Sequence, residues 1–406
     1  MIDVPALRAH FPALRPGSGT PTAHFDGPGG SQVPDVVAAA VSGTLTAGIA
    51  NRGRVTAAER VADDTVLAAR AAMADLLGGE AGGIVFGRSM TALTFDLART
   101  LAAGWSPGDE IVVTRLDHDA NIRPWVLAAR RAGVTVRWAE FDAESAELPV
   151  ANVAAVLSER TRLVAVTAAS NLLGTRPDVA AICAAAHGAG AVTYVDAVHA
   201  AAHAPLDQAQ LGADLLVCSP YKFLGPHCGV LSGRVDLLES LHPDKLLPST
   251  DAVPERFELG TLPYELLAGT TAAVDFLAGL AGQAHRVAGD RRQQLLAAMA
   301  GVDEHEERLR RRIEDGLAGL PGVTVHSRAA RRTPTLLITF ARATPDAAYR
   351  FLAERGVNAP AGSFYAIEAA RFLGLGDGGG LRVGLAPYND DEDVDRLLAG
   401  LGEFLS

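Results

Sequence analysis

The segment DLLVCSPYKFLGPHCGVL, residues 214–231, carries the strongest structural signal in the chain. It begins with a continuously apolar run, which is typical of a β-strand buried on both faces of a parallel sheet. Lys222 follows directly after this run, between Tyr221 and Phe223. Burial in apolar surroundings lowers the pKa of a lysine, and the neutral amine can then form an imine with an aldehyde. The alternative is a lysine whose stem covers the strand end while its ammonium group reaches water.

Outward from this segment, short β-branched runs alternate with helical patterns, which predicts a sheet covered by helices. Thr56 and Glu59 form a capping-box pattern that starts an alanine-rich helix, and this helix ends at Gly78 and Gly79. The runs that predict strands share apolar, β-branched residues and lie at 84–86, 110–114, 134–139, 163–167, 191–195 and 215–218. A large α/β domain with a mainly parallel sheet is therefore expected.

A smaller αβ domain is predicted towards the C-terminus. Its helices and strands alternate, with a helix at about 290–316, strands at 323–326 and 335–340, a further helix, a strand at 381–386 and a helix from about 390. No glycine- or serine-rich linker separates the two parts, so we expect them to share an interface. We place the large domain at 23–280 and the small domain at 281–406, with residues 1–22 packing against the small domain.

The composition excludes several classes of function. The 406 residues carry 36 Lys+Arg against 47 Asp+Glu, a net charge of 36 − 47 = −11, and 49% are hydrophobic. An acidic chain without clustered cations is unsuited to the phosphate backbone of nucleic acids. No apolar run reaches the ~18 residues of a membrane helix, and the N-terminus does not resemble a signal peptide. Three cysteines, Cys183, Cys218 and Cys228, are too few for a disulfide framework, so we expect a cytoplasmic protein.

A second signal lies at Asp196, which ends a predicted strand. Open α/β sheets bind their ligands at this edge. The Asp196 carboxylate can keep a pyridine nitrogen protonated, or it can simply cap the next helix.

Two clusters also offer metal ligands. Asp196 lies near His199 and His203, which are one helical turn apart, and Asp117 and Asp119 flank His118. Neither spacing matches a recognised metal motif such as HExxH.

The third signal is FGRSMTAL, residues 86–93, where Ser89, Met90 and Thr91 open a helix after a strand. Free amides and hydroxyls at a helix N-terminus suit a phosphate group, although a plain helix cap explains them too. The segment lacks GxGxxG and GxxxxGK[ST], so neither a dinucleotide nor a nucleoside triphosphate is implied.

Taken in order, these segments resemble the class V aminotransferase family of pyridoxal-phosphate enzymes, and within it the cysteine desulfurase-like group. The resemblance covers nearly the whole chain, and the segments that carry it are RAHFPAL (8–14), FDGPGGSQVP (25–34), NRGR (51–54), FGRSMTAL (86–93), DHDANIRPW (117–125), TAASNLLGT (167–175), VDAVH (195–199), SPYKFLGPHCGVL (219–231), RFELGT (256–261) and LRVGLAPYN (381–389). It implies the aspartate aminotransferase-like fold (fold type I). It also implies a homodimer with the active site at the subunit interface.

The resemblance implies roles for single residues. Lys222 matches the lysine that forms the internal aldimine and moves protons at the substrate's α-carbon. Asp196 matches the aspartate on the pyridine nitrogen, and His118 matches the histidine that stacks on the ring. His199 stands where desulfurases usually carry glutamine beside the ring's phenolic oxygen. The phosphate contacts implied are Ser89, Met90, Thr91, Ser219, Tyr221 and, from the neighbouring subunit, Thr261.

Substrate contacts follow in the same way. Arg382 matches the arginine that pairs with the α-carboxylate of an amino acid, a task suited to the two parallel hydrogen bonds of a guanidinium. Asn171 lies beside it in the family pattern, and Asn51 and Arg52 are further expected contacts.

The chain departs from the desulfurase pattern at two places. Tyr264 falls where desulfurases place a small hydroxyl residue. Ser363, Phe364 and Tyr365 stand where the desulfurase loop carries the cysteine that attacks the substrate's sulfur, and no cysteine occurs after Cys228. We interpret Cys228 as structural, because a buried free cysteine usually behaves as a small hydrophobe.

The leading hypothesis is a homodimeric pyridoxal-phosphate enzyme acting on an α-amino acid, either an aminotransferase or a desulfurase-like lyase without the persulfide cysteine. One alternative is a metal-dependent hydrolase that uses the two Asp/His clusters. Another is a degenerate cofactor-binding fold that serves as a scaffold for partner proteins.

Overall fold

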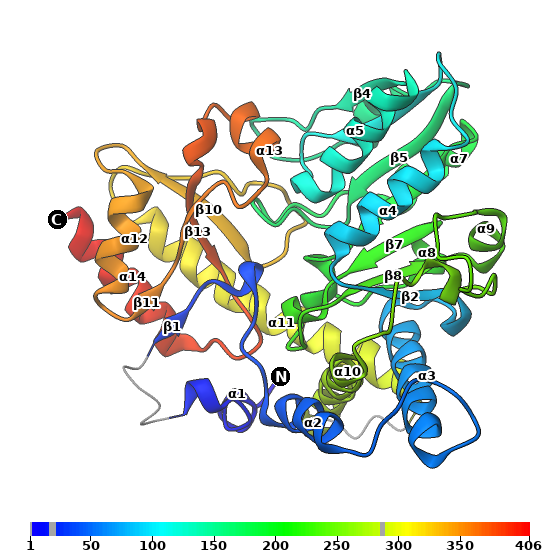
Figure 1. Cartoon of the computed structure of the whole chain (residues 1–406). Coiled ribbons are helices and arrows are strands. Elements are labelled where there is room, and N and C mark those ends of the chain that lie inside the picture. The colour runs from blue at the N-terminus through cyan, green and yellow to red at the C-terminus, as the bar shows by residue number, and fades with distance from the viewer. Residues whose placement is uncertain (1, 16–21, 285–288) are drawn as a thin grey trace.

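A seven-stranded sheet forms the centre of the larger part of the molecule in the computed structural model, which describes residues 2–15, 22–284 and 289–406 (Figure 1). The strand order is β2-β8-β7-β6-β5-β3-β4. The strands are β2 (Ile84–Gly87), β3 (Glu110–Thr114), β4 (Thr135–Ala139), β5 (Thr161–Thr167), β6 (Val192–Asp196), β7 (Leu215–Cys218) and β8 (Gly229–Gly233). The direction of β8 is opposite to that of the other six strands, so the predicted mainly parallel sheet is confirmed.

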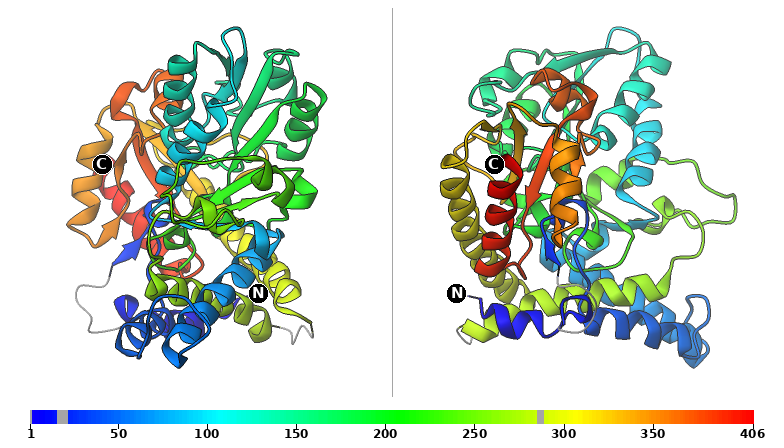
Figure 2. Two further views of the ribbon diagram at one scale, coloured as in Figure 1. Left: turned by 45° about the vertical axis from the view of Figure 1, so that its right-hand side comes forward. Right: turned by 90° about the vertical axis from the view of Figure 1, so that its left-hand side faces the viewer.

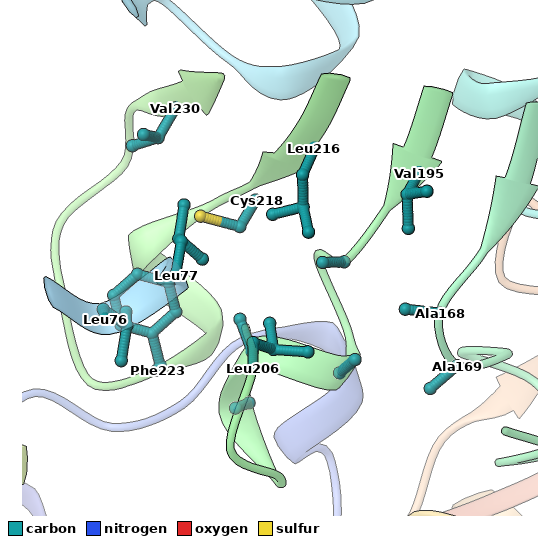
Figure 3. Packing of buried hydrophobic residues seen from close by; sticks show 14 of the residues in the cluster. Leu76, Leu77, Ala168, Ala169, Val195, Leu206, Leu216, Cys218, Phe223 and Val230 are labelled. Atoms are coloured by element: carbon teal, nitrogen blue, oxygen red, sulfur yellow. The ribbon is translucent and has the colours of Figure 1, made fainter. Parts of the chain in front are cut away.

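The apolar strands are buried because helices cover both faces of this sheet. In β7, Leu215 and Val217 belong to one hydrophobic cluster, whereas Leu216 and Cys218 belong to another. Side chains alternate between faces along a strand, so an unbroken apolar run fits a sheet with two buried faces. Figure 3 shows one of these faces, where Leu216 and Cys218 point towards Leu77 of a covering helix.

Two groups of helices cover the sheet. On the Leu215 side lie α4 (Met90–Ala102) and α5 (Arg123–Ala132). The other helices of this part are α2 (Asp35–Thr46), α3 (Ala57–Leu77), α6 (Val150–Ala154), α7 (Val179–Gly188), α8 (Gln208–Leu211), α9 (Val235–Ser240) and α10 (Tyr264–Ala284). Both views of Figure 2 show α2 and α10 side by side at the base of the molecule, together with α1 (Val4–Arg8).

Helix α3 begins and ends where the sequence predicts. The Thr56 side chain accepts a hydrogen bond from the Glu59 backbone N–H, and the Glu59 side chain accepts one from the Thr56 backbone N–H. These two bonds form the capping box. Gly78 ends the helix with φ 67°, a left-handed conformation that costs glycine little.

The smaller part has its own sheet and its own hydrophobic cluster. The sheet order is β12-β13-β10-β9. The elements of this part are β9 (Val323–Val325), β10 (Thr335–Phe340), α12 (Pro345–Ala353), β11 (Val357–Asn358), β12 (Ala361–Gly362), α13 (Ile367–Phe372), β13 (Gly380–Gly384) and α14 (Asp391–Leu405). β1 (Ala23–His24) pairs with β11, and so attaches the N-terminal region here.

The long helix α11 (Arg291–Ala318) connects the two parts. Its Val302 belongs to the hydrophobic cluster of the large sheet, whereas Leu309 belongs to the cluster of the small one. Because one helix contributes to both cores, no linker marks a boundary, and the division at residue 281 stays a prediction. None of the helices in the described ranges has the length and apolarity to cross a membrane.

Candidate active site

A cavity of about 500 Å³, including its open mouth, lies at the carboxyl ends of β5, β6 and β7 and at the N-terminus of α4. The predicted residues that line it are Ser89, Met90, Thr91, His118, Asn171, Asp196, His199, Ser219, Tyr221 and Lys222. Four further residues line the cavity but were not predicted as site residues: Ala120, Thr167, Ala169 and Val198. The sheet therefore gathers residues that lie up to 133 positions apart in the sequence, from Ser89 to Lys222.

Lys222 is held by the short turn that follows β7. Its side chain is 9% exposed, and its Nζ donates a hydrogen bond to the Pro28 carbonyl, so the head of the lysine lies inside the protein. Burial lowers the pKa of Lys222 to about 7, and the charge of Arg382 acts in the same direction, while Asp196 opposes both. Near neutral pH, this amine therefore exists in both charged and neutral forms.

Asp196 is the last residue of β6 and lines the same cavity. Its Oδ1 accepts a hydrogen bond from the Val198 backbone at 2.9 Å. Burial raises its pKa to about 6, against the opposing effect of Lys222. A cationic group at this place, such as a protonated pyridine nitrogen, would favour the carboxylate form.

His118 lines the cavity as a neutral imidazole. Its Nδ1 accepts a hydrogen bond from the Ala120 backbone N–H at 3.0 Å, so its proton resides on Nε2. Burial lowers the pKa of His118 to about 4, with further effects from the charges of Lys222 and Arg382. The ring centroid lies 5.6 Å from that of Tyr365, which follows Phe364 in a loop of the smaller part of the molecule.

The N-terminus of α4 lines part of the cavity. Ser89 is the N-cap of α4 and accepts a hydrogen bond from the Ala92 backbone at 3.1 Å. Across the cavity, the Tyr221 ring stacks on His227, with centroids 4.7 Å apart and planes 6° apart. A Cβ on Gly229 would overlap the backbone of Ser89 and Met90, so only glycine allows β8 to approach the start of α4 this closely.

Arg382 lies beside the cavity on β13 and is 3% exposed. Its Nη1 donates to the Asn171 carbonyl at 3.1 Å, and its guanidinium carbon lies 3.6 Å from the centroid of the Phe364 ring. Burial lowers the pKa of Arg382 to about 9. Asn171 Nδ2 donates to the Phe364 carbonyl at 3.0 Å, so Phe364 is held to both residues.

The backbone of the Phe364 loop adopts an uncommon conformation. Phe364 and Tyr365 have φ of 52° and 58°, in the left-handed region that bulky residues rarely occupy. The Tyr365 carbonyl accepts a hydrogen bond from the Asp119 backbone at 2.7 Å, and this contact ties the loop to the segment that carries His118. Such strain, when it persists, is typical of functional sites.

Besides Arg382, three predicted contacts do not line the cavity within this chain. Asn51 and Thr261 are exposed, and Arg52 is engaged elsewhere. Arg52 forms ion pairs with Asp63 at 2.9 Å and Glu255 at 3.0 Å, and its backbone N–H donates to the Tyr264 hydroxyl at 3.3 Å.

The structure does not favour the metal-site alternative. The described ranges contain no group of three His, Cys, Asp or Glu side chains that could hold a metal ion. Asp117 accepts hydrogen bonds from Thr114 and Asn121, and Asp119 pairs with Arg123 at 2.9 Å. In the second cluster, His203 Nδ1 lies 2.8 Å from Glu306. These side chains already have protein partners, which their spacing in the sequence did not reveal.

The donor set of the cavity fits pyridoxal phosphate. Three buried atoms at the site, Asn171 Oδ1, His199 Nδ1 and Arg382 Nε, have no hydrogen-bond partner among the described residues, although buried polar atoms are normally paired. A lysine with a lowered pKa suits an aldehyde, a buried carboxylate suits a protonated ring nitrogen, and a helix N-terminus suits a phosphate.

Comparisons with known proteins agree with this chemistry. The model of the family described as Aminotransferase class-V matches residues 23–397. An uncharacterized protein of Mycobacterium tuberculosis is 34% identical over 403 residues, covering 98% of both chains. A probable cysteine desulfurase of Pseudomonas aeruginosa is 30% identical and covers 98% of this chain and 97% of its own length.

The solved structures include a cysteine desulfurase, CsdA, of Escherichia coli. Its structure superimposes with a TM-score of 0.85 at 28% identity, and the match covers 100% of both chains. The chain therefore belongs to the class V aminotransferase family, with cysteine desulfurases among its relatives, and is an enzyme dependent on pyridoxal phosphate.

Proposed function

We propose that this protein acts at the α-carbon of an α-amino acid, with Lys222 as the lysine that binds pyridoxal phosphate. The observation that carries the proposal is the convergence of Lys222, Asp196 and His118 on one cavity, with a buried arginine, Arg382, beside it. Bound pyridoxal phosphate supplies an aldehyde for amines and a ring that withdraws electrons from the substrate.

Lys222 is suited to move the proton. A general base works best when its pKa lies near the working pH, and the pKa of this amine is about 7. His118, which is neutral with its proton on Nε2, presents a hydrogen-bond donor to the same cavity. Asp196 supplies the negative charge that keeps a ring nitrogen protonated.

Arg382 is the proposed receptor for the substrate's α-carboxylate. A buried guanidinium offers paired N–H donors in a fixed plane, and here the Asn171 carbonyl and the Phe364 ring hold that plane in place. An amino acid bound there would have its α-carbon within the same site as Lys222.

The reaction does not pass sulfur to a loop cysteine in this proposal. The loop carries Ser363, Phe364 and Tyr365, and the three cysteines of the chain are buried. Burial raises the pKa of Cys183 and of Cys228 to about 11, and these thiols are therefore protonated and weakly nucleophilic. Transamination and elimination from the side chain both remain compatible with the cavity.

A second copy of the chain completes the site in this proposal. Thr261 is exposed and does not line the cavity of its own chain, and Leu247 and Leu259 are 97% and 60% exposed. Figure 2 shows that the loop from α9 to α10, which carries these leucines, stands away from the body of the molecule. Sedimentation of the purified protein tests this point, and a monomer at micromolar concentration would contradict it.

The experiment that tests the function uses purified protein loaded with pyridoxal phosphate. Wild type is expected to be yellow and to turn over at least one amino acid in a panel assayed separately for keto acid, ammonia and sulfide. Lys222→Ala is expected to lose the colour and the turnover, while Cys228→Ala keeps both. A Cys228→Ala variant that loads the cofactor yet loses all turnover would contradict the cysteine-free chemistry.

A further inference from the structure

A line of buried polar side chains leads from the cavity to helix α11. His199 lines the cavity, and the centroid of its ring lies 4.6 Å from that of His203 in a T-shaped contact. His203 Nδ1 and Glu306 Oε2 are joined by a hydrogen bond of 2.8 Å. All three residues are buried, and Glu306 has no exposed surface.

Glu306 lies at the junction of the two parts of the molecule. It follows Val302, which packs in the core of the large sheet, and precedes Leu309, which packs in the core of the small sheet. Burying a carboxylate between two apolar cores is costly, and apolar side chains of similar volume often stabilise such a position as well or better. Stability therefore gives no reason for a glutamate here.

Two hydroxyl groups hold one side of the His199 ring. Thr333 Oγ1 lies 2.9 Å from His199 Nε2, and Thr335 Oγ1 lies 3.0 Å from the same nitrogen. His199 Nδ1 is buried and has no hydrogen-bond partner among the described residues. The two hydroxyls and the contact with the His203 ring together fix the position of this imidazole.

The charged groups around this line come from several elements. Burial lowers the pKa of His199 well below its usual value, and the charges of His203, Lys222 and Arg382 act in the same direction. Burial raises the pKa of Glu306, His203 opposes the rise, and Asp303 on the same helix adds to it. Burial raises the pKa of Tyr388, which follows β13, and the charge of Glu306 adds to this rise.

We propose that Glu306 and His203 form a positioning pair that fixes the orientation of the His199 ring beside the bound cofactor. The pair touches neither cofactor nor substrate, and it acts through His199. This inference rests on the proposed binding of pyridoxal phosphate in this cavity. It assigns to α11 a role in the cofactor site that its position outside the cavity lining does not suggest.

The test compares Glu306→Gln with a matched variant at the other end of the sheet. The control is Asp214→Asn, because Asp214 is a buried carboxylate that lies 2.8 Å from His187, at the amino end of β7. Two quantities are measured: the dissociation constant for pyridoxal phosphate, and the pH at which the visible absorbance of the loaded protein changes.

In Glu306→Gln, the carboxylate that holds His203 is lost, so the His203 ring no longer fixes the position of the His199 ring. A displaced imidazole changes the polar surroundings of the bound cofactor, and the pH midpoint is expected to shift by roughly half a unit or more from the wild-type value. Asp214→Asn is expected to keep the wild-type midpoint. Thr333→Val, which removes one hydrogen bond to His199 without changing the core's volume, is expected to weaken cofactor binding about fivefold.

The outcomes distinguish this inference from the proposed function. If Glu306→Gln loads the cofactor with the wild-type midpoint and dissociation constant, the positioning pair is refuted while the function stands. If Glu306→Gln fails to fold, His203→Gln decides in its place, because it can still bond to Glu306 but has no ring to pack on His199. A wild-type midpoint and dissociation constant in that variant refute the inference. If Lys222→Ala keeps the wild-type colour, the proposed function itself fails.

Discussion

The lowered pKa of Lys222 gives a prediction that needs no substrate. The chain contains just two lysines, Lys222 and Lys245. Lys222 is buried with a pKa of about 7, whereas Lys245 pairs with Asp251 at 3.1 Å near the surface. At pH 7, about half of the Lys222 amines are neutral, against roughly one in three thousand for a lysine with the usual pKa. The neutral fraction is therefore about a thousandfold larger.

Amine labelling of the cofactor-free protein measures this difference. The protein is treated briefly with acetic anhydride between pH 5.5 and 10, and the two lysine peptides are quantified by mass spectrometry. We expect the labelling of Lys222 to reach half of its plateau near pH 7. The midpoint, and not the yield, carries the result, because burial slows access of the reagent at every pH.

A variant tests the cause of the shift. After burial, the positive charge of Arg382 is the largest effect that lowers the pKa of Lys222, so Arg382→Met is expected to move the labelling midpoint to higher pH. If the labelling of Lys222 in the folded wild-type protein reaches half of its plateau only near pH 10, the ordinary range of a lysine, the reasoning from burial and charge is refuted.

Three further predictions concern the surroundings of the site. Phe364→Leu removes the stack on Arg382, which is worth roughly 1–2 kcal/mol. The amino-acid concentration that gives a half-maximal spectral change should therefore rise about five- to thirtyfold. An unchanged titration would contradict the role of the stack. Gly229→Ala places a methyl group against the backbone at the start of α4 and is expected to abolish cofactor retention in gel filtration, whereas retention would show that β8 can move aside. Thr56→Ala removes the cap of α3 and is expected to lower the free energy of unfolding by about 1 kcal/mol in urea, with the cofactor spectrum unchanged.

The sequence predicted the elements of the fold well where a local pattern determines them. The capping box at Thr56 and the apolar run of β7 depend on neighbouring residues, and both appear as expected. Strand β8 was not predicted, because GVLSG is short and contains two glycines. It is recognisable as a strand from its pairing with β2 and β7, which the sequence does not show. This strand is the one that runs against the others.

The candidate site was predicted in part. Lys222 and Asp196 follow apolar strands, so their position at one edge of the sheet could be inferred from the pattern. The stack of Phe364 on Arg382 and the pairing of Glu306 with His203 join residues far apart in the sequence, and no local signal marks them. The metal alternative is not favoured, and the sequence could not show this, since the spacing of Asp117 and His203 does not reveal which partners already bind them.

The central claim is that Lys222 holds pyridoxal phosphate, and the scarcity of lysine in this chain allows a direct test. The loaded protein is reduced with borohydride, digested and examined by mass spectrometry. We expect the pyridoxyl group on the peptide that contains Lys222, and its loss after addition of an amino acid substrate before reduction. Modification of Lys245, or of neither lysine, would contradict the account.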